Sequence, residues 1–570
     1  METFQSLLAK KLSDALKNAG LPDTGELTPA SDPRFGDYQT NAALMLGKQR
    51  GENPRVLAEK IVSQLDVGDL CEPPVVAGVG FINFTLRSGA VAEKTVEVLG
   101  DERLGVAKAR SPRRIVIDFG SPNVAKPMHV GHIRSTVLGD ALARIAQFLG
   151  HEVIRDNHIG DWGTQFGMVI YGWKNLLDRQ ALQRDPLAEI VRIYKDTNER
   201  ATGDPQVREG CRQELIKLQA GDRENLDIWN ECVALSMQDF EHVYKLLDIH
   251  YDIQCGESFY HDRLPGVVER LLKSGIAEIS DGAVVVFFPE NPELADKPLI
   301  IRKRDGGFNY ATTDLATADY RLETWQPQEI IYITGGPQQL HFRQLFASFG
   351  RWQPQARVKL AHVWFGSILG EDGRPFKTRA GESVRLAELL DEAQERAFKT
   401  VSDKSPELPE AQRREIARIV GVSAIKYADL LPNRQSDYVF SWDRMLALNG
   451  NTAPYLLYAY ARIRSIFRKG GEMKLTAEAL KIGAEQELAL AKHLLNFEFV
   501  LAAAAEEYRP NYICNYLYDL AGLFNRFFEN CPVLKAEPEV RNSRLVLSDL
   551  AARVLKQGLD ALGIQTLEQM

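Results

Sequence analysis

The segment 115–159 constrains the fold of this chain more than any other. Residues 115–119 (IVIDF) form a short apolar run, which suits a buried strand of a parallel sheet. After a polar loop, residues 133–149 place apolar side chains at helical spacing, and Gly150 suits the end of that helix. Residues 151–159 (HEVIRDNHI) then form a second strand. A strand, a helix and a strand within about 40 residues predict a βαβ unit, and hence a parallel sheet with a right-handed connection.

Four regions are expected along the 570 residues, in line with about 150 residues per domain. The fold class is α/β, because strands and polar loops continue after the βαβ unit and predict a Rossmann-like parallel-sheet domain at 109–382. Charged, helical sequence at about 170–255 predicts an insertion in that domain. Residues 1–108 mix both kinds of element and predict an α+β N-terminal domain. From 383 the chain is almost purely helical, which predicts a connecting region to 445 and an all-helical domain at 446–570.

Composition narrows the possible functions. The formal net charge of -8 excludes a globally basic protein that coats DNA, but it allows a local basic groove for RNA phosphates. The six cysteines are scattered without a C-x-x-C pair, so we expect neither a disulfide framework nor structural zinc, and a reducing compartment. The chain has no apolar run of about 18 residues, and its N-terminal stretch lacks the apolar core of a signal peptide. We therefore expect a cytoplasmic protein without a membrane-spanning segment.

Two histidines lie where the first strand leads into its helix. His129 and His132 share one face of the first helical turn, and each imidazole can donate to a phosphate oxygen. The unpaired N–H groups and positive dipole of the helix N-terminus favour an anion at the same place, and Gly131 leaves room for a flat base. Alone, the H-x-x-H pattern could equally be two surface histidines or part of a metal site. A metal needs a third protein ligand, and only His158 is nearby, so we expect no protein-bound metal.

Longer motifs around these histidines resemble a known family. Residues 121–136 (SPNVAKPMHVGHIRST) resemble the HIGH signature of class I aminoacyl-tRNA synthetases in its arginyl form, and residues 158–167 (HIGDWGTQFG) resemble a second arginyl motif. Residues 35–43 and 80–84 are similar to the family's N-terminal tRNA-contacting domain, and residues 451–466 to the start of its anticodon-binding domain. The resemblance implies an enzyme that activates L-arginine with ATP and Mg²⁺ and esterifies it to tRNA(Arg), with a monomer as the family norm.

The resemblance also implies which residues hold the phosphates of ATP. His129 and His132 are the donors. A second cation normally comes from a K-M-S-K-S loop, from which this chain departs: the matching stretch is 374–378 (RPFKT), where Lys377 is the retained position. Lys126 could add positive charge from the other side. Because positioning and charge stabilisation dominate such a reaction, these four side chains are the catalytic candidates. The expected ATP site comprises His129, Gly131, His132, Gly335 and Lys377.

Recognition of arginine requires carboxylates that meet a planar guanidinium, with a neutral acceptor beside them. Tyr310 and Asp314 are four residues apart and share one face if helical. They resemble the family's Y-x-x-x-D, whose tyrosine and aspartate hold the guanidinium. Asp118 matches an acidic position that helps, while Asn123 and Gln338 match positions that contact the α-ammonium group. Without the resemblance, Tyr310 could equally be a core ring and Asp314 an ordinary surface acid.

The C-terminal region carries a candidate RNA-binding stripe. Tyr455, Tyr458 and Arg462 recur at helical steps, so rings could stack on bases and the guanidinium could meet phosphate. Tyrosines at this spacing could equally line a core. The resemblance implies that arginine activation needs bound tRNA, and FGDY at 35–38 is a further candidate contact. Two rivals are another class I synthetase, against which 158–167 argues, and a non-catalytic RNA-binding relative, which should have lost its phosphate ligands.

Overall fold

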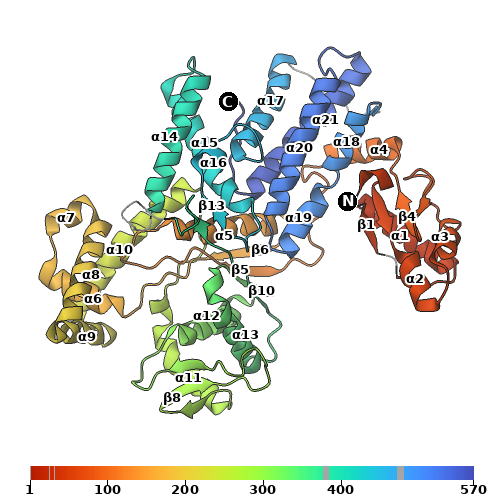
Figure 1. Ribbon diagram of the computed structural model, residues 1–570. Coiled ribbons are helices and arrows are strands. Elements are labelled where there is room, and N and C mark those ends of the chain that lie inside the picture. The colour runs from red at the N-terminus through yellow and green to blue at the C-terminus, as the bar shows by residue number, and fades with distance from the viewer. Residues whose placement is uncertain (1, 25, 31, 377–383, 471–474, 476–479) are drawn as a thin grey trace.

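The computed structural model describes residues 2–24, 26–30, 32–376, 384–470, 475 and 480–570 (Figure 1). An N-terminal domain, a parallel sheet with inserted helices, and a C-terminal bundle follow one another along the chain. In Figure 1 the N-terminal domain lies beside the C-terminal helices, and the yellow inserted helices lie on the opposite side of the molecule.

The N-terminal part combines an antiparallel sheet with helices. Its strands, in sheet order, are β1 (Leu27–Pro29), β2 (Tyr38–Thr40), β4 (Phe81–Phe84) and β3 (Val75–Ala77). Its helices are α1 (Phe4–Asn18), the short η1 (Pro33–Phe35), α2 (Ala42–Arg50), α3 (Pro54–Val62) and α4 (Ser88–Leu99). α1 begins where the Thr3 side chain accepts from the amide of Ser6, and it buries Leu8, Leu12 and Leu16 on one stripe.

The central sheet consists of four parallel strands. In sheet order they are β11 (Lys359–His362), β10 (Glu329–Tyr332), β5 (Arg114–Asp118) and β6 (Glu152–Asp156). The helix α5 (Val130–Phe148) connects β5 to β6, as expected for the βαβ unit. The pairing register sets Asp118 beside both Asp156 and Tyr332. Polar side chains therefore meet at the carboxyl edge of the sheet, where open α/β sheets bind ligands. The predicted α/β class is confirmed.

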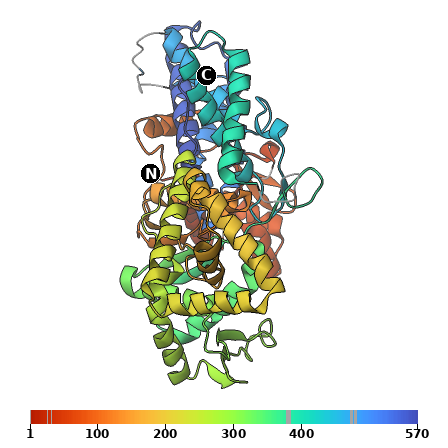
Figure 2. The same cartoon turned by 90° about the vertical axis from the view of Figure 1, so that its left-hand side faces the viewer.

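The chain between β6 and β11 adds helices and a small sheet. Five helices come first: α6 (Gln165–Leu176), α7 (Arg179–Arg184), α8 (Pro186–Gly203), α9 (Pro205–Gln219) and α10 (Arg223–Leu246). Next come η2 (Glu257–Arg263), α11 (Leu264–Lys273), the antiparallel strands β7 (Glu278–Ser280), β8 (Ala283–Val286) and β9 (Leu299–Arg302), and α12 (Tyr310–Trp325). The short η3 (Gly336–Gln338) and α13 (Gln339–Trp352) come after β10. Figure 2 shows the yellow inserted helices in front of the sheet domain, at an angle to one another.

The C-terminal part is a bundle of helices. They are α14 (Leu386–Lys404), α15 (Glu410–Leu430), the short α16 (Trp442–Met445), α17 (Ala453–Gly470), α18 (Glu485–Leu494), α19 (Phe497–Glu506), α20 (Asn511–Asn530) and α21 (Pro538–Ala561). The two-residue strands β12 (Ile368–Leu369) and β13 (Tyr438–Val439) pair in parallel between the sheet domain and this bundle. The central helix α5 is tied to the bundle as well, because the buried side chain of Arg134 lies 3.2 Å from Asp429 of α15.

One segment of the described chain, 485–506, has the length and apolar composition of a membrane-spanning helix. It forms two helices, α18 and α19, rather than one. Leu490, Leu494, Phe497 and Leu501 are buried in the hydrophobic core that this bundle shares with the rest of the molecule. These four apolar side chains therefore have a place inside the fold, whereas Phe499 of the same segment is 45% exposed.

Candidate active site

The two histidines of the H-x-x-H motif frame the N-terminus of α5. His129 is the N-cap residue, and its Nδ1 accepts a hydrogen bond from the amide of Gly131 at 3.1 Å. Nδ1 of His132 accepts from the amide of His129, also at 3.1 Å. The ring centroids are 4.0 Å apart. Because both Nδ1 atoms accept, each neutral imidazole carries its proton on Nε2 and can donate it to a ligand.

Both histidines are neutral near pH 7. Burial lowers the pKa of His129, and the charge of Lys126 lowers it further. Burial and the neighbouring His129 lower the pKa of His132 to about 3. The pair therefore offers two neutral N–H donors. The two histidines supply no positive charge for a phosphate ligand, and that charge has to come from other groups.

The backbone amides at the start of α5 already have partners inside the chain. The amide of Val130 donates to the carbonyl of Val384 at 3.0 Å, and that of His132 donates to the carbonyl of His129 at 2.8 Å. The Gly131 amide is used by the His129 ring. The sequence predicted unpaired N–H groups here, and the structure differs because a histidine cap and the segment at Val384 satisfy them. A ligand at this point would meet imidazoles and the helix dipole.

The loop that precedes α5 lies against the motif at 158–167. The amide of Val124 donates to the carbonyl of Gly160 at 3.0 Å. A β-carbon added at Gly160 would come within 2.1 Å of Oδ1 of Asn123, so this close approach requires glycine. Asn123 itself is exposed to solvent. The motif thus fixes the position of a side chain that is expected, from the family resemblance, to contact the α-ammonium group of arginine.

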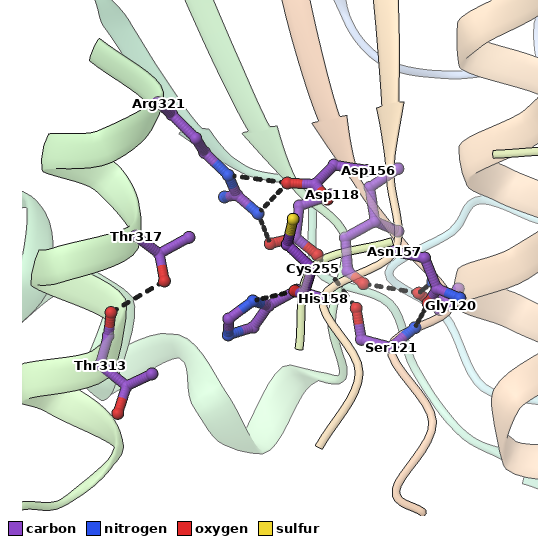
Figure 3. A network of polar contacts seen from close by, with 12 residues as sticks. Asp118, Gly120, Ser121, Asp156, Asn157, His158, Cys255, Thr313, Thr317 and Arg321 are labelled. Carbon is purple, nitrogen blue, oxygen red and sulfur yellow. Dashed lines mark hydrogen bonds and ion pairs between the residues drawn. The ribbon is translucent and has the colours of Figure 1, made fainter. Parts of the chain in front are cut away.

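A buried ion cluster lies at the carboxyl ends of β5 and β6 (Figure 3). Nη2 of Arg321, from α12, lies 2.6 Å from Oδ2 of Asp118 and 2.7 Å from Oδ2 of Asp156. Ser121 donates to Oδ1 of Asp118 at 3.0 Å. Burial disfavours the charge of Arg321, but Asp118 and Asp156 outweigh it and raise its pKa well above the ordinary value. Asp118, expected to help bind a substrate guanidinium, already binds the guanidinium of Arg321.

Asp314 and Tyr310 lie on the first two turns of α12. Oδ2 of Asp314 is 2.6 Å from Nε2 of His341. The ring of Tyr310 meets the His341 ring edge-on, with centroids 4.7 Å apart, and Tyr310 is 62% exposed. The two side chains predicted to hold a guanidinium therefore share one neighbour, His341. The sequence had left open that Tyr310 is a core ring and that Asp314 is an ordinary surface acid. In the structure Tyr310 is exposed and Asp314 contacts His341.

A cavity of about 430 Å³ opens beside these residues, and its lining includes Asn123, Trp162, Glu257, His261, Tyr310 and Thr313. Burial is the main cause that raises the pKa of Glu257 to about 7; the charges of Asp314 and Asp161 act in the same direction, and His158 acts against them. Carboxyl groups crowded in this way favour a cationic ligand, because each loses repulsion when a positive charge enters.

The remaining predicted residues of the ATP and arginine sites occupy separate segments. Gly335 and Gln338 come after β10, and the side chain of Gln338 is exposed. Lys126 is also exposed, and its Nζ lies 5.6 Å from the centre of the Tyr194 ring. Lys377 lies outside the residues that the structure describes.

The candidate RNA stripe divides into two faces. Tyr455 and Arg462 lie together against α20: Nδ2 of Asn525 donates to the Tyr455 hydroxyl at 3.0 Å, and the Arg462 guanidinium lies 4.9 Å from the centre of the Phe528 ring. Tyr458 is exposed and lines another cavity, of about 330 Å³, with residues of α14. Packing thus accounts for Tyr455 and Arg462 in part, whereas Tyr458 is available at the surface.

Three side chains of this region were not singled out by the sequence. Arg321 lies seven residues beyond Asp314, His341 lies three residues beyond Gln338, and Glu257 lies within GES at 256–258. Each has an ordinary local context, and only the fold brings it to the carboxyl edge of the sheet. The described residues contain no group of three or more His, Cys, Asp or Glu side chains that could hold a metal ion.

Comparisons with family models, with known relatives and with solved structures all match this chain to the same group of proteins. A family model described as tRNA synthetases class I (R), catalytic domain, matches residues 94–442. Models of the arginyl tRNA synthetase N terminal domain and of the DALR anticodon binding domain match residues 3–86 and 456–570. The arginine–tRNA ligase of Cyanothece sp. is 47% identical over 95% of both chains, and that of Hahella chejuensis is 45% identical over 100% of both. The solved arginyl-tRNA synthetases of Plasmodium falciparum and Thermus thermophilus match all of the chain with TM-scores of 0.86 and 0.84, at 29% and 27% identity.

Proposed function

The chain belongs to the arginyl-tRNA synthetase family, and from this premise we propose which of its residues bind arginine, ATP and tRNA. The enzyme converts ATP, L-arginine and tRNA(Arg) to AMP, diphosphate and L-arginyl-tRNA(Arg) through an arginyl-adenylate. This assignment removes the alternative of a class I synthetase for another amino acid. Family membership alone does not assign a role to any individual residue. The roles proposed below are supported by the geometry of the site.

For arginine, we propose that the guanidinium enters the cavity lined by Tyr310 and Glu257 and meets Tyr310 and Asp314, with Glu257 as a third contact. The observation that supports this proposal is that Tyr310 lines the cavity together with Glu257, while Tyr310 and Asp314 contact the same His341 ring. A planar guanidinium donates up to five hydrogen bonds and matches carboxylates that approach it edge-on. Asn123 and Gln338 face the α-ammonium group. Asp118 acts at the floor of the site, together with its internal partner Arg321.

For ATP, we propose that Nε2 of His129 and of His132 donate to phosphate oxygens, and that Gly131 and Gly335 allow close approach of the nucleoside. As the arginine carboxylate attacks the α-phosphorus, negative charge grows on the phosphate oxygens and diphosphate leaves. Preorganised N–H donors stabilise that charge without rearrangement. Lys126 and Lys377 supply the positive charge that two neutral histidines lack. Mg²⁺ accompanies ATP through its phosphate oxygens rather than through a protein cluster.

For tRNA, we propose that the domains expected at 1–108 and 446–570 hold the two arms of the molecule around the sheet domain at 109–382. Tyr458 is the strongest candidate for stacking on a base, because its ring is exposed, whereas Tyr455 and Arg462 lie against α20 on another face of the same helix. Two further regions belong to this domain division: the helical insertion at about 170–255 and the helical connecting region at 383–445. The composition and the family resemblance support a cytoplasmic monomer without a DNA or membrane partner.

The decisive experiment is ATP–pyrophosphate exchange with and without tRNA, comparing arginine with its neutral isostere citrulline. We expect exchange that depends on arginine and on tRNA, and rejection of citrulline by several orders of magnitude, because the partly buried carboxylate of Asp314 would be left without a cationic partner. Asp314→Asn should reduce that discrimination, while the exposed surface variant Asp281→Asn should not. Equal activation of arginine and citrulline by the unaltered enzyme would refute the assignment of Asp314. No exchange in a folded sample that still binds tRNA would indicate a non-catalytic relative.

A further inference from the structure

His341 joins the two segments that line the arginine site. It lies on the first turn of α13, three residues after Gln338, and its side chain reaches across to α12. Figure 1 shows α12 and α13 next to each other at the end of the parallel sheet. Nε2 of His341 lies 2.6 Å from Oδ2 of Asp314, and the two side chains are 11% and 22% exposed. This short contact lies next to Tyr310 and Thr313, which line the cavity, and it is not required to hold either helix in place, since both helices bury apolar faces in the same core.

The proton of the His341 ring can be placed from its surroundings. Nδ1 is buried and has no hydrogen-bond partner among the described residues. A proton on Nδ1 would be an unpaired buried donor, whereas a proton on Nε2 points at the Asp314 carboxylate. The neutral tautomer with the proton on Nε2 therefore fits the site. It hydrogen-bonds to Asp314 without cancelling its charge, so the carboxylate remains available to a cation.

The same ring also fixes Tyr310. The phenol is largely exposed, and the edge-on contact with His341, at an interplanar angle of 75°, is the aromatic contact that the structure gives it. Without that contact a solvated tyrosine would sample several rotamers, and each would have to be frozen when arginine binds. One histidine thus restricts both side chains that the proposed function assigns to the guanidinium.

We propose that His341 is a positioning residue for arginine recognition, which orients the carboxylate of Asp314 and the ring of Tyr310 before arginine enters. His341 donates to Oδ2 of Asp314, so that Oδ1 remains to accept from the guanidinium. The inference rests on the proposed function, because it takes Asp314 and Tyr310 as the residues that meet the guanidinium. It predicts a role in arginine affinity alone, with no part in ATP binding or in the chemical step.

The test compares two replacements of His341 in the full-length enzyme by ATP–pyrophosphate exchange with saturating tRNA. His341→Phe keeps the ring and its packing but removes the donor, and we expect the KM for arginine to rise about 10- to 100-fold, as for loss of a hydrogen bond to a charged group. The KM for ATP and kcat should stay within about threefold, because neither depends on the guanidinium contact. His341→Gln restores an N–H donor and should recover part of the arginine affinity. The matched changes at the exposed His250, Phe and Gln, should have no effect.

A double-mutant cycle with Asp314→Asn separates this inference from the proposed function. If His341 acts through Asp314, then His341→Phe should add little in the Asp314→Asn background. An equal increase in the KM for arginine in both backgrounds would overturn the inference and leave the role of Asp314 intact. An Asp314→Asn enzyme with unchanged arginine KM would overturn the proposed function, and the inference with it. A rise in the KM for ATP equal to that for arginine in His341→Phe would show that the residue merely supports the fold.

Discussion

Nζ of Lys492 lies 2.7 Å from Oδ2 of Asp37, and this contact joins the C-terminal bundle to the N-terminal domain across 455 residues of sequence. The same oxygen accepts the amide of Leu86 at 2.7 Å. Asp37 belongs to the FGDY segment, a candidate tRNA contact by its sequence. Its carboxylate is used inside the protein, whereas the Phe35 ring of the same segment is 48% exposed. The segment therefore combines a structural residue with one that is free to meet RNA.

Asp37→Ala and Phe35→Ala should have different effects. The first removes the acceptor shared by Lys492 and the Leu86 amide, so we expect the free energy of unfolding of the N-terminal domain to fall by about 1–3 kcal/mol. The second removes only an exposed ring, so stability should change by less than about 0.5 kcal/mol while the KM for tRNA rises. Thermal unfolding and aminoacylation kinetics measure the two quantities. A Phe35→Ala enzyme with unaltered tRNA kinetics would show that FGDY has a structural role only.

The Arg321 cluster should be sensitive to the loss of one carboxylate. Asp156→Asn leaves a fully buried guanidinium with Asp118 as its remaining charged partner. We expect the stability of the sheet domain to fall by about 3–5 kcal/mol, as is typical when one partner of a buried ion pair is removed. Urea unfolding measures this loss, and Asp227→Asn, at an exposed carboxylate on α10, serves as the control. If the free energy of unfolding falls by less than about 1 kcal/mol, water or Asp118 alone is enough to compensate the buried charge of Arg321.

The βαβ unit was predictable because its signals are local. The apolar run at 115–119, the helical spacing after His129 and the second strand each lie within one short stretch, and the parallel sheet is confirmed. The two long motifs identified the family for the same reason. Tyr310 and Asp314 were singled out because they resemble the family's Y-x-x-x-D, and the structure places both at the start of α12.

The contacts of these residues were not predictable, because they depend on the tertiary fold. Asp118 was expected to meet a guanidinium, but no local pattern shows that Arg321, some 200 residues later, provides one. His341 and Glu257 are single polar residues without a motif of their own, and only the arrangement around the sheet brings them to Asp314. The amides of α5 were expected to be free, and the histidine cap that occupies them depends on side-chain geometry.

Arginine affinity should depend on pH through Glu257. Its pKa is about 7, because burial and the charges of Asp314 and Asp161 raise it above the ordinary value. Below pH 7 the carboxyl group is mostly protonated and attracts a guanidinium weakly, whereas above pH 7 it is ionised. We therefore expect the KM for arginine to fall as pH rises from about 6 to 8, while the guanidinium stays charged throughout. Exchange kinetics across this range measure the effect.

The control for this pH effect is Glu257→Gln, which cannot ionise. Its KM for arginine should be higher than that of the unaltered enzyme at pH 8, and it should vary less between pH 6 and 8. A pH profile that is identical in the two enzymes would assign the titration to another group. His132 is not a candidate in this range, because its pKa of about 3 keeps it neutral throughout.

Gly160→Ala should impair arginine binding through Asn123. The added β-carbon would lie 2.1 Å from Oδ1 of Asn123, so the amide has to rotate away from the cavity, and the strand-like pairing with the loop before α5 is strained. We expect the KM for arginine to rise about tenfold or more, with a smaller change in the KM for ATP, because misplacement by about 1 Å at a binding group costs orders of magnitude. Gly203→Ala is the matched control: it lies at the end of α8, where a β-carbon meets no atom within 4 Å. The double mutant tests this explanation. If Asn123→Ala raises the KM for arginine by the same factor in the Gly160→Ala enzyme as in the unaltered enzyme, the two residues act independently. The clash then does not explain the effect of Gly160→Ala.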